Sequence, residues 1–331
     1  WVAALLRMKQ ESIVPAGDYI LALTAGEEGG SGYVGIEWLI AHRRDLLDVE
    51  YVLNPDAGGG ELDHGKPIVF TVQAAEKVFH TLHLTVRNPG GHSSLPVRDN
   101  AINRLAAALG RVAAYDFPFE TNAVTRASFA RRASLATGSL ASEMRAVSGP
   151  TLDRAAATRL ASRSAFYNAM LRTTCIATMI DGGHAVNALP QRVQATVNCR
   201  ILPGKDPVEV ERTIRRVVAD TAVVVAAADT ATPSPPSPLP PALEATLKSI
   251  VTPMWGALPI VPTMETGATD GLYLRNAGLA VYGVTGLFVD PNNADDVRAH
   301  GLNERIGVKQ YYDQLEFTYR LLKALGEGGA M

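Results

Sequence analysis

Two adjacent carboxylates, Glu27 and Glu28, lie in the glycine-rich stretch GEEGGSG that follows the apolar run DYILALTA. Neighbouring carboxylates repel one another unless a positive charge holds them together. A divalent metal ion can do this, because one carboxylate then binds the metal while the other accepts a proton from the water that the metal activates. For the pair taken alone, two solvated acidic side chains in a surface loop are the more common situation. The pair is therefore a candidate metal and proton-transfer site that needs support from the rest of the chain.

The same loop also fits a dinucleotide-binding motif. Gly30, Gly32 and Gly35 have the G-x-G-x-x-G spacing between an expected strand and an expected helix, and Asp56 lies near the place of a ribose-binding acid. However, the two adjacent carboxylates would then stand beside the pyrophosphate and oppose its charge. Dinucleotide binding is therefore the minor alternative for this loop.

Three histidines lie in loops beside glycine, a placement that favours function, although each alone is more often an ordinary residue. They are His92 in PGGHSS, His184 in DGGHAVNALP and His300 in RAHGLNER. Asn187 and Arg200 could bind a carboxylate together, because an arginine fork and an amide both donate hydrogen bonds to it. A plain surface arginine is an equally good interpretation of Arg200.

The composition excludes several classes of protein. Lys and Arg number 31 against 33 Asp and Glu, so there is no basic field of the kind that a dedicated binder of nucleic acid or anionic membrane needs. No apolar run approaches the length that spans a bilayer. The only cysteines are Cys175 and Cys199, on two expected neighbouring strands, which excludes a disulfide scaffold and a four-cysteine zinc module. We expect them to be buried free thiols without a nucleophilic role.

The order of elements predicts a parallel α/β sheet that brings the acidic residues to one edge. We expect a buried strand over residues 18–25, a helix over 33–47 and a further strand in EYVLNPDAGGG. In such sheets, ligands bind outside the carboxyl ends of the strands. Glu27, Glu28 and Asp56 all follow such ends.

The pattern changes near Ala75 and again at the proline-rich stretch PSPPSPLPP. KVFHTLHLTVRN alternates like a half-buried strand, TTCIATMIDGG and RVQATVNCRIL are further strands, and residues 115–167 indicate helical pieces in an irregular insertion. Strands and helices do not alternate strictly here, which favours a smaller antiparallel α+β domain. We therefore expect a catalytic domain made of residues 1–74 and 233–331, with residues 75–232 inserted as a second domain.

Seven motifs in order resemble the co-catalytic zinc peptidase family: LTAGEEGGSG, LNPDAGGG, NPGGHSSLP, GGHAVNALPQ, VNCRILPG, TGATDG and AHGLNERI. This family includes aminoacylases, acetylornithine deacetylase, succinyl-diaminopimelate desuccinylase and glutamate carboxypeptidase, and the chain looks most like its carboxypeptidase-like branch. Each motif is modest alone, but together they cover essentially the whole chain. The resemblance implies a zinc-exopeptidase-like α/β catalytic domain with an inserted α+β lid and dimerisation domain, and a homodimer formed through that inserted domain.

The resemblance also implies a role for each matching residue. Glu27 matches the general base, Glu28 and His300 match the ligands of one zinc, and Asp56 matches a ligand of the other. His92 matches the histidine that reaches the partner subunit's site and stabilises the oxyanion.

Four more residues match the family's substrate-binding positions. Asn187 and Arg200 match residues that hold the substrate carboxylate, and Gly267 and Thr269 match the loop that lines that pocket. The implied protein is a hydrolase that uses two zinc ions, or another divalent metal, to cleave the amide bond of a small peptide or an N-acyl amino acid.

The chain departs from the family pattern at its start. The family's His-x-Asp motif and its bridging Asp both precede a helix like WVAALLRMKQES, and neither is present here. We therefore expect residues upstream of Trp1 to be missing, which leaves the compartment open and makes this chain alone poor in metal and inactive. The alternative is a degenerate homologue that dimerises without catalysis.

Overall fold

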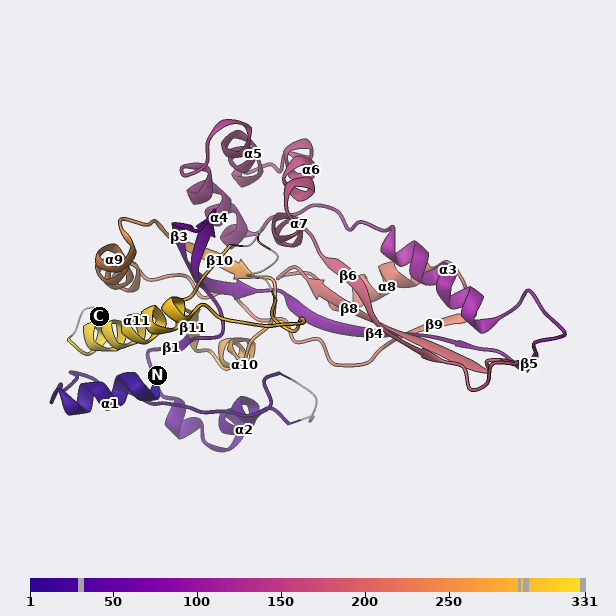
Figure 1. Cartoon of the computed structure of the whole chain (residues 1–331), viewed down its shortest axis with the longest axis horizontal. Coiled ribbons are helices and arrows are strands. Elements are labelled where there is room, and N and C mark those ends of the chain that lie inside the picture. The colour runs from indigo at the N-terminus through magenta and orange to yellow at the C-terminus, as the bar shows by residue number, and fades with distance from the viewer. Residues whose placement is uncertain (29–32, 291–292, 294–297, 328–331) are drawn as a thin grey trace. The chain divides into compact units, whose positions relative to one another are not determined.

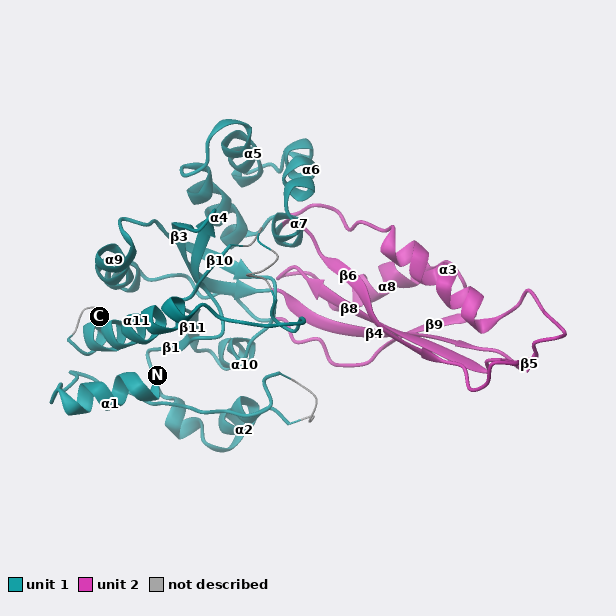
Figure 2. Cartoon of the chain, viewed as in Figure 1, with its two compact units in different colours: residues 1–76, 121–170, 234–331 teal, residues 77–120, 171–233 magenta. Residues whose placement is uncertain are grey.

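The computed structural model describes residues 1–28, 33–290, 293 and 298–327 of the chain. It divides into two compact units, coloured separately in Figure 2. Unit 1 consists of residues 1–76, 121–170 and 234–331, and unit 2 of residues 77–120 and 171–233. Two glycines of the dinucleotide motif, Gly30 and Gly32, lie outside the described residues.

The mixed sheet of unit 1 has the strand order β1-β11-β3-β2-β12, with β10 also paired to β3. β1 and β11 are parallel, as are β10 and β3, whereas β2 and β3 form an antiparallel pair. Every residue of β3 from Val69 to Glu76 is buried, because both faces of this strand are covered. The bounds are β1 (Tyr51–Asn54), β2 (Gly59–Asp63), β3 (Lys66–Glu76), β10 (Ile260–Glu265), β11 (Ala280–Gly283) and β12 (Phe288–Val289).

Helices pack against this sheet through an aromatic cluster. The ring of Phe70 on β3 lies 5.3 Å from that of Phe317 and 6.1 Å from that of Trp255. Figure 1 shows α1 beside α11, where the Arg7 guanidinium lies over the ring of Tyr319. Within the described residues, no helix combines the length and the apolar character needed to cross a membrane. The bounds are α1 (Val2–Gln10), α2 (Gly35–His42), η1 (Arg44–Leu47), α9 (Pro241–Trp255), α10 (Gly271–Asn276) and α11 (Val308–Gly326).

The helical pieces expected within residues 115–167 are present, but they group with unit 1 rather than with the inserted domain. They are α4 (Ala123–Ala133), α5 (Gly138–Ser148), α6 (Arg154–Arg163) and α7 (Ala165–Leu171). The physical reason is a set of ion pairs that tie α4 to unit 1. Arg132 is buried and binds Glu61 of β2, which is 12% exposed, and Arg131 binds Glu244 of α9.

Unit 2 is an antiparallel α+β unit, as its sequence pattern predicts. Its sheet has the order β6-β8-β4-β9, and the side chains of β4 alternate between buried and more exposed positions. Two helices cover one face, and Leu82, Leu105 and Ile214 lie in the shared core (Figure 1). The bounds are β4 (Val78–Arg87), β5 (Gly91–His92), α3 (Ala101–Ala113), β6 (Thr174–Gly182), β7 (Ala188–Leu189), β8 (Arg192–Ile201), α8 (Pro207–Val218) and β9 (Val223–Ala227).

The strand predicted over residues 18–25 is absent. This segment has no regular structure, and Leu21 and Leu23 are exposed by 39% and 79%. A strand needs a hydrogen-bonded neighbour, and none of the described strands pairs with this segment. The predicted helix that follows is divided into α2 and the short helix η1. The prediction of a parallel strand before Glu27 is therefore wrong.

The prediction of free thiols is also wrong, because Cys175 and Cys199 form a disulfide. The two residues are directly opposite each other in the antiparallel pairing of β6 and β8, with Cα atoms 4.0 Å apart. Opposite positions point to the same face of a sheet, so the two sulfur atoms meet. The strands themselves were predicted, but their register was not.

Candidate active site

Several carboxylates of unit 1 lie close enough to affect one another. Glu27 is half-buried, and its pKa is raised to about 7, first by burial and then by the charges of Asp56, Glu28 and Asp270. The pKa of Asp56 is raised to about 6 by desolvation and by the charges of Glu28 and Asp270. The surrounding negative charges thus make Glu27 and Asp56 harder to ionise. A bound cation would relieve this mutual repulsion.

Asp270 belongs to this acidic cluster, although the sequence analysis did not select it. Its carboxylate accepts a hydrogen bond from Thr24 Oγ1 at 2.9 Å, and burial raises its pKa. The available signal was its position directly after Thr269 in the motif TGATDG.

The structure brings two of the predicted zinc ligands into contact. Glu28 Oε2 lies 3.2 Å from His300 Nε2, although the residues are 272 positions apart. Both side chains are largely exposed, at 78% and 82%, so the contact by itself contributes little to stability. A contact between predicted ligands that packing does not require is what a metal-binding pair would show.

The residues of the cluster have the donor types of a metal site but not a complete set. Carboxylate and imidazole groups bind zinc and several other divalent metals. Within the described part of the chain, however, no group of three or more His, Cys, Asp or Glu side chains converges to hold an ion. The donor set therefore fits part of a metal site at Glu28 and His300, with Asp56 nearby.

The loop that contains Gly267 and Thr269 lies beside this cluster in unit 1. Thr269 is buried, and both its backbone N–H and its hydroxyl donate to Glu76 Oε2, at 3.1 and 2.9 Å. Gly267 is more open, since a Cβ atom built there would meet only Glu265 Cγ at 3.9 Å. Of the two, Gly267 is the better placed to meet a ligand.

In unit 2, His92 and Asn187 are held together by the small sheet of β5 and β7. His92 pairs with Ala188, and the N–H of Ser93 donates to the carbonyl of Asn187 at 2.9 Å. The His92 side chain is exposed and its Nδ1 lies 2.7 Å from the Ser94 hydroxyl. The structure therefore places these two predicted residues at one small two-stranded sheet.

Arg200 lies far from that two-stranded sheet within the same unit. The segments that form β5 and β7 leave the larger sheet next to Arg87 and Arg192, which pair with each other, and Arg200 is eight positions further along β8. At a rise of about 3.3 Å per residue this separation is roughly 26 Å. Arg200 donates to Asn198 Oδ1 at 3.0 Å, and burial lowers the pKa of its guanidinium. One copy of unit 2 thus does not bring Arg200 and Asn187 to the same small ligand.

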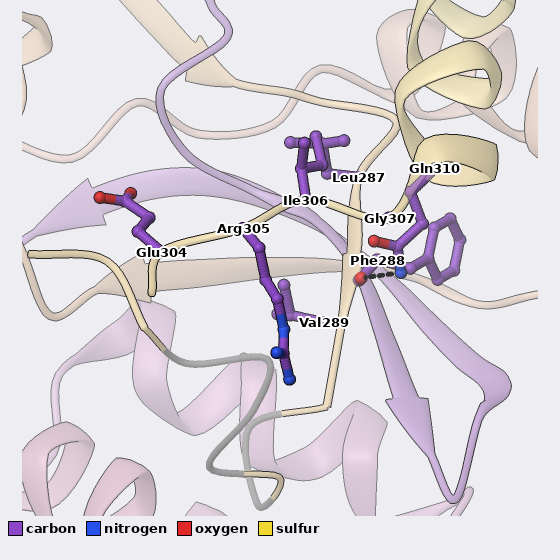
Figure 3. A pocket seen from close by; sticks show the side chains of 8 residues that line it. All are labelled: Leu287, Phe288, Val289, Glu304, Arg305, Ile306, Gly307 and Gln310. Atoms are coloured by element: carbon purple, nitrogen blue, oxygen red, sulfur yellow. Dashed lines mark hydrogen bonds between the residues drawn. The ribbon is translucent and has the colours of Figure 1, made fainter. Parts of the chain in front are cut away.

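A cavity of about 650 Å³ lies elsewhere in unit 1 (Figure 3). Gln310 crosses part of it to donate to the carbonyl of Phe288 at 2.7 Å. Its lining includes none of the predicted site residues, so this cavity is separate from the candidate site. It is lined by Leu287, Phe288, Val289, Glu304, Arg305, Ile306, Gly307 and Gln310.

Close backbone packing explains the third glycine of the dinucleotide motif. The N–H of Gly35 donates to the carbonyl of Ala25 at 2.8 Å, and a Cβ atom on Gly35 would lie only 2.8 Å from Ala25 N. Any larger residue would push α2 away from the segment before Glu27. Gly35 therefore has a structural role that does not require a dinucleotide.

The chain is similar to a family model and to several known proteins. Residues 74–225 match the M20 peptidase dimerisation domain. The chain is 29% identical over 327 residues to human N-fatty-acyl-amino acid synthase/hydrolase PM20D1, a match that covers 94% of this chain and 62% of that protein. It is 28% identical over 262 residues to the probable carboxypeptidase S-like 2 of Dictyostelium discoideum, covering 78% of this chain and 49% of the relative. The chain thus spans less than two thirds of these relatives.

The fold is similar to that of a solved enzyme. An M20 family metallo-carboxypeptidase from Sulfolobus solfataricus superposes with a TM-score of 0.59 at 18% identity, over 91% of this chain and 69% of that one. This similarity supports the architecture of a peptidase-type α/β unit combined with a dimerisation domain.

Proposed function

We propose that the chain is an M20-type peptidase that acts in the metal-dependent hydrolysis of an amide or peptide bond next to a free carboxylate, a proposal supported by its matched dimerisation domain and its relatives. The observation that carries the proposal is the contact of Glu28 with His300 beside a half-buried Glu27. The names of the relatives indicate N-acyl amino acids or the carboxyl ends of peptides as the substrate class.

The reaction assigns a distinct task to each residue of the acidic cluster. Glu28 and His300 would hold one zinc ion and Asp56 would contribute to the other, and bound zinc supplies Lewis acidity and lowers the pKa of water. Glu27 accepts the proton of the attacking water and returns it to the leaving nitrogen. A half-buried carboxyl, whose pKa burial raises, is suited to this exchange.

The remaining residues would bind and orient the substrate. His92 donates a hydrogen bond to the oxyanion, while Asn187, Arg200 and the loop at Gly267 hold the free carboxylate. Arg200 is roughly 26 Å along β8 from Arg192, the end at which the segment of Asn187 joins that strand. A small substrate therefore meets both Asn187 and Arg200 only when two copies of unit 2 contribute. The proposal therefore includes a homodimer, in which each site takes His92 and Asn187 from the partner.

Metal uptake and hydrolysis test the proposal together. These measurements, and the activity measurements below, use a form of the protein extended to the length of its relatives, because the described residues of this chain supply only part of a ligand set. Dialysis of the extended form against zinc followed by plasma mass spectrometry is expected to show bound zinc, with little in this chain alone, and His300→Ala should lower the zinc affinity of the extended form by at least tenfold. Hydrolysis is measured on N-acyl amino acids and on the matched carboxamides, which should react more slowly. An extended form that neither takes up zinc nor hydrolyses these substrates would favour the second candidate, a non-catalytic homologue that dimerises. The incomplete ligand group among the described residues motivates that alternative.

The edge of β6 is the surface that we propose for dimerisation. β6 ends the sheet of unit 2, and an unpaired edge is a template for a strand of a second copy. Its residues Ile176, Met179 and Ile180 are exposed by 65–69%, an apolar edge within the matched dimerisation domain. Ile180→Lys is expected to convert the dimer into a monomer at micromolar concentration, as seen by light scattering.

The opposite edge of the same sheet provides the control. Val224 on β9 is 58% exposed, and Val224→Lys should leave the dimer intact. Dissociation by Val224→Lys but not by Ile180→Lys would place the interface on β9 instead.

A further inference from the structure

A buried carboxylate in unit 1 is not explained by the proposed chemistry. Glu76 is the last residue of β3 and is only 3% exposed. Its Oε2 accepts hydrogen bonds from the backbone and hydroxyl of Thr269 and, at 2.9 Å, from Gln73 Nε2. Its Oε1 lies 2.6 Å from Arg275 Nη2, in an ion pair whose side chains are 1% and 2% exposed.

Burial of this ion pair costs free energy that other contacts of the fold must offset. Desolvation of two charges commonly exceeds their mutual attraction, and apolar side chains of the same volume are often as stable. Burial raises the pKa of Glu76, while Arg275, Thr269 and Gln73 oppose the rise. What the pair achieves instead is a fixed position for the segment that donates to it.

That segment is the loop at residues 266–270. The Thr269 hydroxyl has one proton, which it gives to Glu76, and the same oxygen accepts from the N–H of Gly271 at 3.0 Å. Gly271 must be glycine for this arrangement, because a Cβ atom there would lie 2.9 Å from Thr269 Oγ1 and 3.2 Å from Arg275 Nη1. The Thr269 hydroxyl thus uses its proton and an acceptor site in hydrogen bonds that hold the loop.

The loop connects this buried network with the acidic cluster. Gly267 precedes Thr269 by two residues, and Asp270 follows it and binds Thr24. A shift of Thr269 would therefore move both the open backbone at Gly267 and the carboxylate that influences Glu27.

We infer that Glu76 is a positioning residue that fixes the 266–270 loop through Thr269, and that the Thr269 hydroxyl contacts Glu76 rather than the substrate carboxylate. The second half of this inference rests on the proposed function. It gives Thr269 a different role from the one implied by the family resemblance, and it leaves the Gly267 side of the loop to meet the ligand.

Hydrogen exchange of the full chain, followed by mass spectrometry, tests the positioning role without any substrate. Thr269→Val removes the hydroxyl at nearly constant volume and is expected to speed exchange in the peptide that spans 266–271 by at least tenfold. Thr269→Ser keeps the hydroxyl and should restore protection, and Glu76→Gln should act like Thr269→Val. Peptides from β4 and β8 in unit 2 serve as the internal control. Unchanged exchange in both Thr269→Val and Glu76→Gln would overturn the inference.

A kinetic cycle tests the assignment of the hydroxyl. With an N-acyl amino acid as substrate, Thr269→Val is expected to raise KM about tenfold with little change in kcat. In the Glu76→Gln background, the same substitution should raise KM by less than twofold. A hydroxyl that bound the substrate directly would raise KM by the same factor in both backgrounds, which would refute the assignment. A protein that hydrolyses no substrate would count against the proposed function, while the exchange result would still decide the role of Glu76.

Discussion

Glu27→Gln is expected to lower kcat for hydrolysis of an N-acyl amino acid by about 10²- to 10⁴-fold, the usual contribution of a general acid–base residue. The amide of glutamine fills nearly the same space but cannot accept the proton of the attacking water. Burial is the largest cause of the raised pKa of Glu27, and this cause remains when a bound cation neutralises the charges of Asp56 and Glu28. The measurement is steady-state kinetics with the zinc content determined on the same samples.

The zinc content of each variant distinguishes the general base from the metal ligands. Glu27→Gln should keep the bound zinc of the wild type, because the general base is not a metal ligand in the proposed site. Glu28→Gln should lose zinc and activity together, since Glu28 contacts His300. Glu37→Gln, at an exposed carboxylate on α2, is the matched control and should change neither quantity. If Glu27→Gln hydrolysed the substrate at the rate of Glu37→Gln, Glu27 would not be the base.

Local sequence patterns predict the helices and strands of unit 2 well, because the signals that start or orient each element lie within its own segment. α3 begins where Asn100 accepts a hydrogen bond from the N–H of Ile102, and α8 begins where Asp206 caps a helix with Pro207 at its first position. The alternation of β4 reflects one buried face. Each of these signals is readable without knowledge of the partner element.

Pairing between distant segments was not predictable in the same way. The disulfide of Cys175 and Cys199 depends on the register of β6 against β8, which alternation alone leaves open. The apolar run at 18–25 has the composition of a strand, but no described strand pairs with it. Composition reports what a segment can form, whereas its neighbours decide what it does form.

The candidate site shows the same limit. The motif around Glu28 and the motif around His300 were each recognisable, and the structure brings them together. Asp270 and Glu76 were missed because their importance comes from contacts across the fold, with Thr24 and with Thr269. A charged pair inside the apolar run VQAAEKVF was the only local sign that Glu76 has a special role.

Glu61→Gln is expected to destabilise unit 1 by about 3–5 kcal/mol, because it leaves the Arg132 guanidinium buried beside a neutral partner. The two side chains form a two-pronged pair that joins β2 to α4, and they are only 12% and 5% exposed. Urea unfolding followed by tryptophan fluorescence isolates this effect. All three tryptophans, Trp1, Trp38 and Trp255, belong to unit 1.

The neighbouring pair of Glu244 with Arg131 provides a matched control on the same helix. Its side chains are 34% and 39% exposed, so Glu244→Gln should cost no more than about 1 kcal/mol. Replacing both members of the buried pair, as Glu61→Leu with Arg132→Met, should recover most of the loss, since no charge is then left without a partner. Equal effects of Glu61→Gln and Glu244→Gln would show that the buried pair does not anchor the helices at 121–170. A large loss that the double replacement recovers would explain why these helices fold with unit 1, although in sequence they fall inside the segment that matches the dimerisation domain.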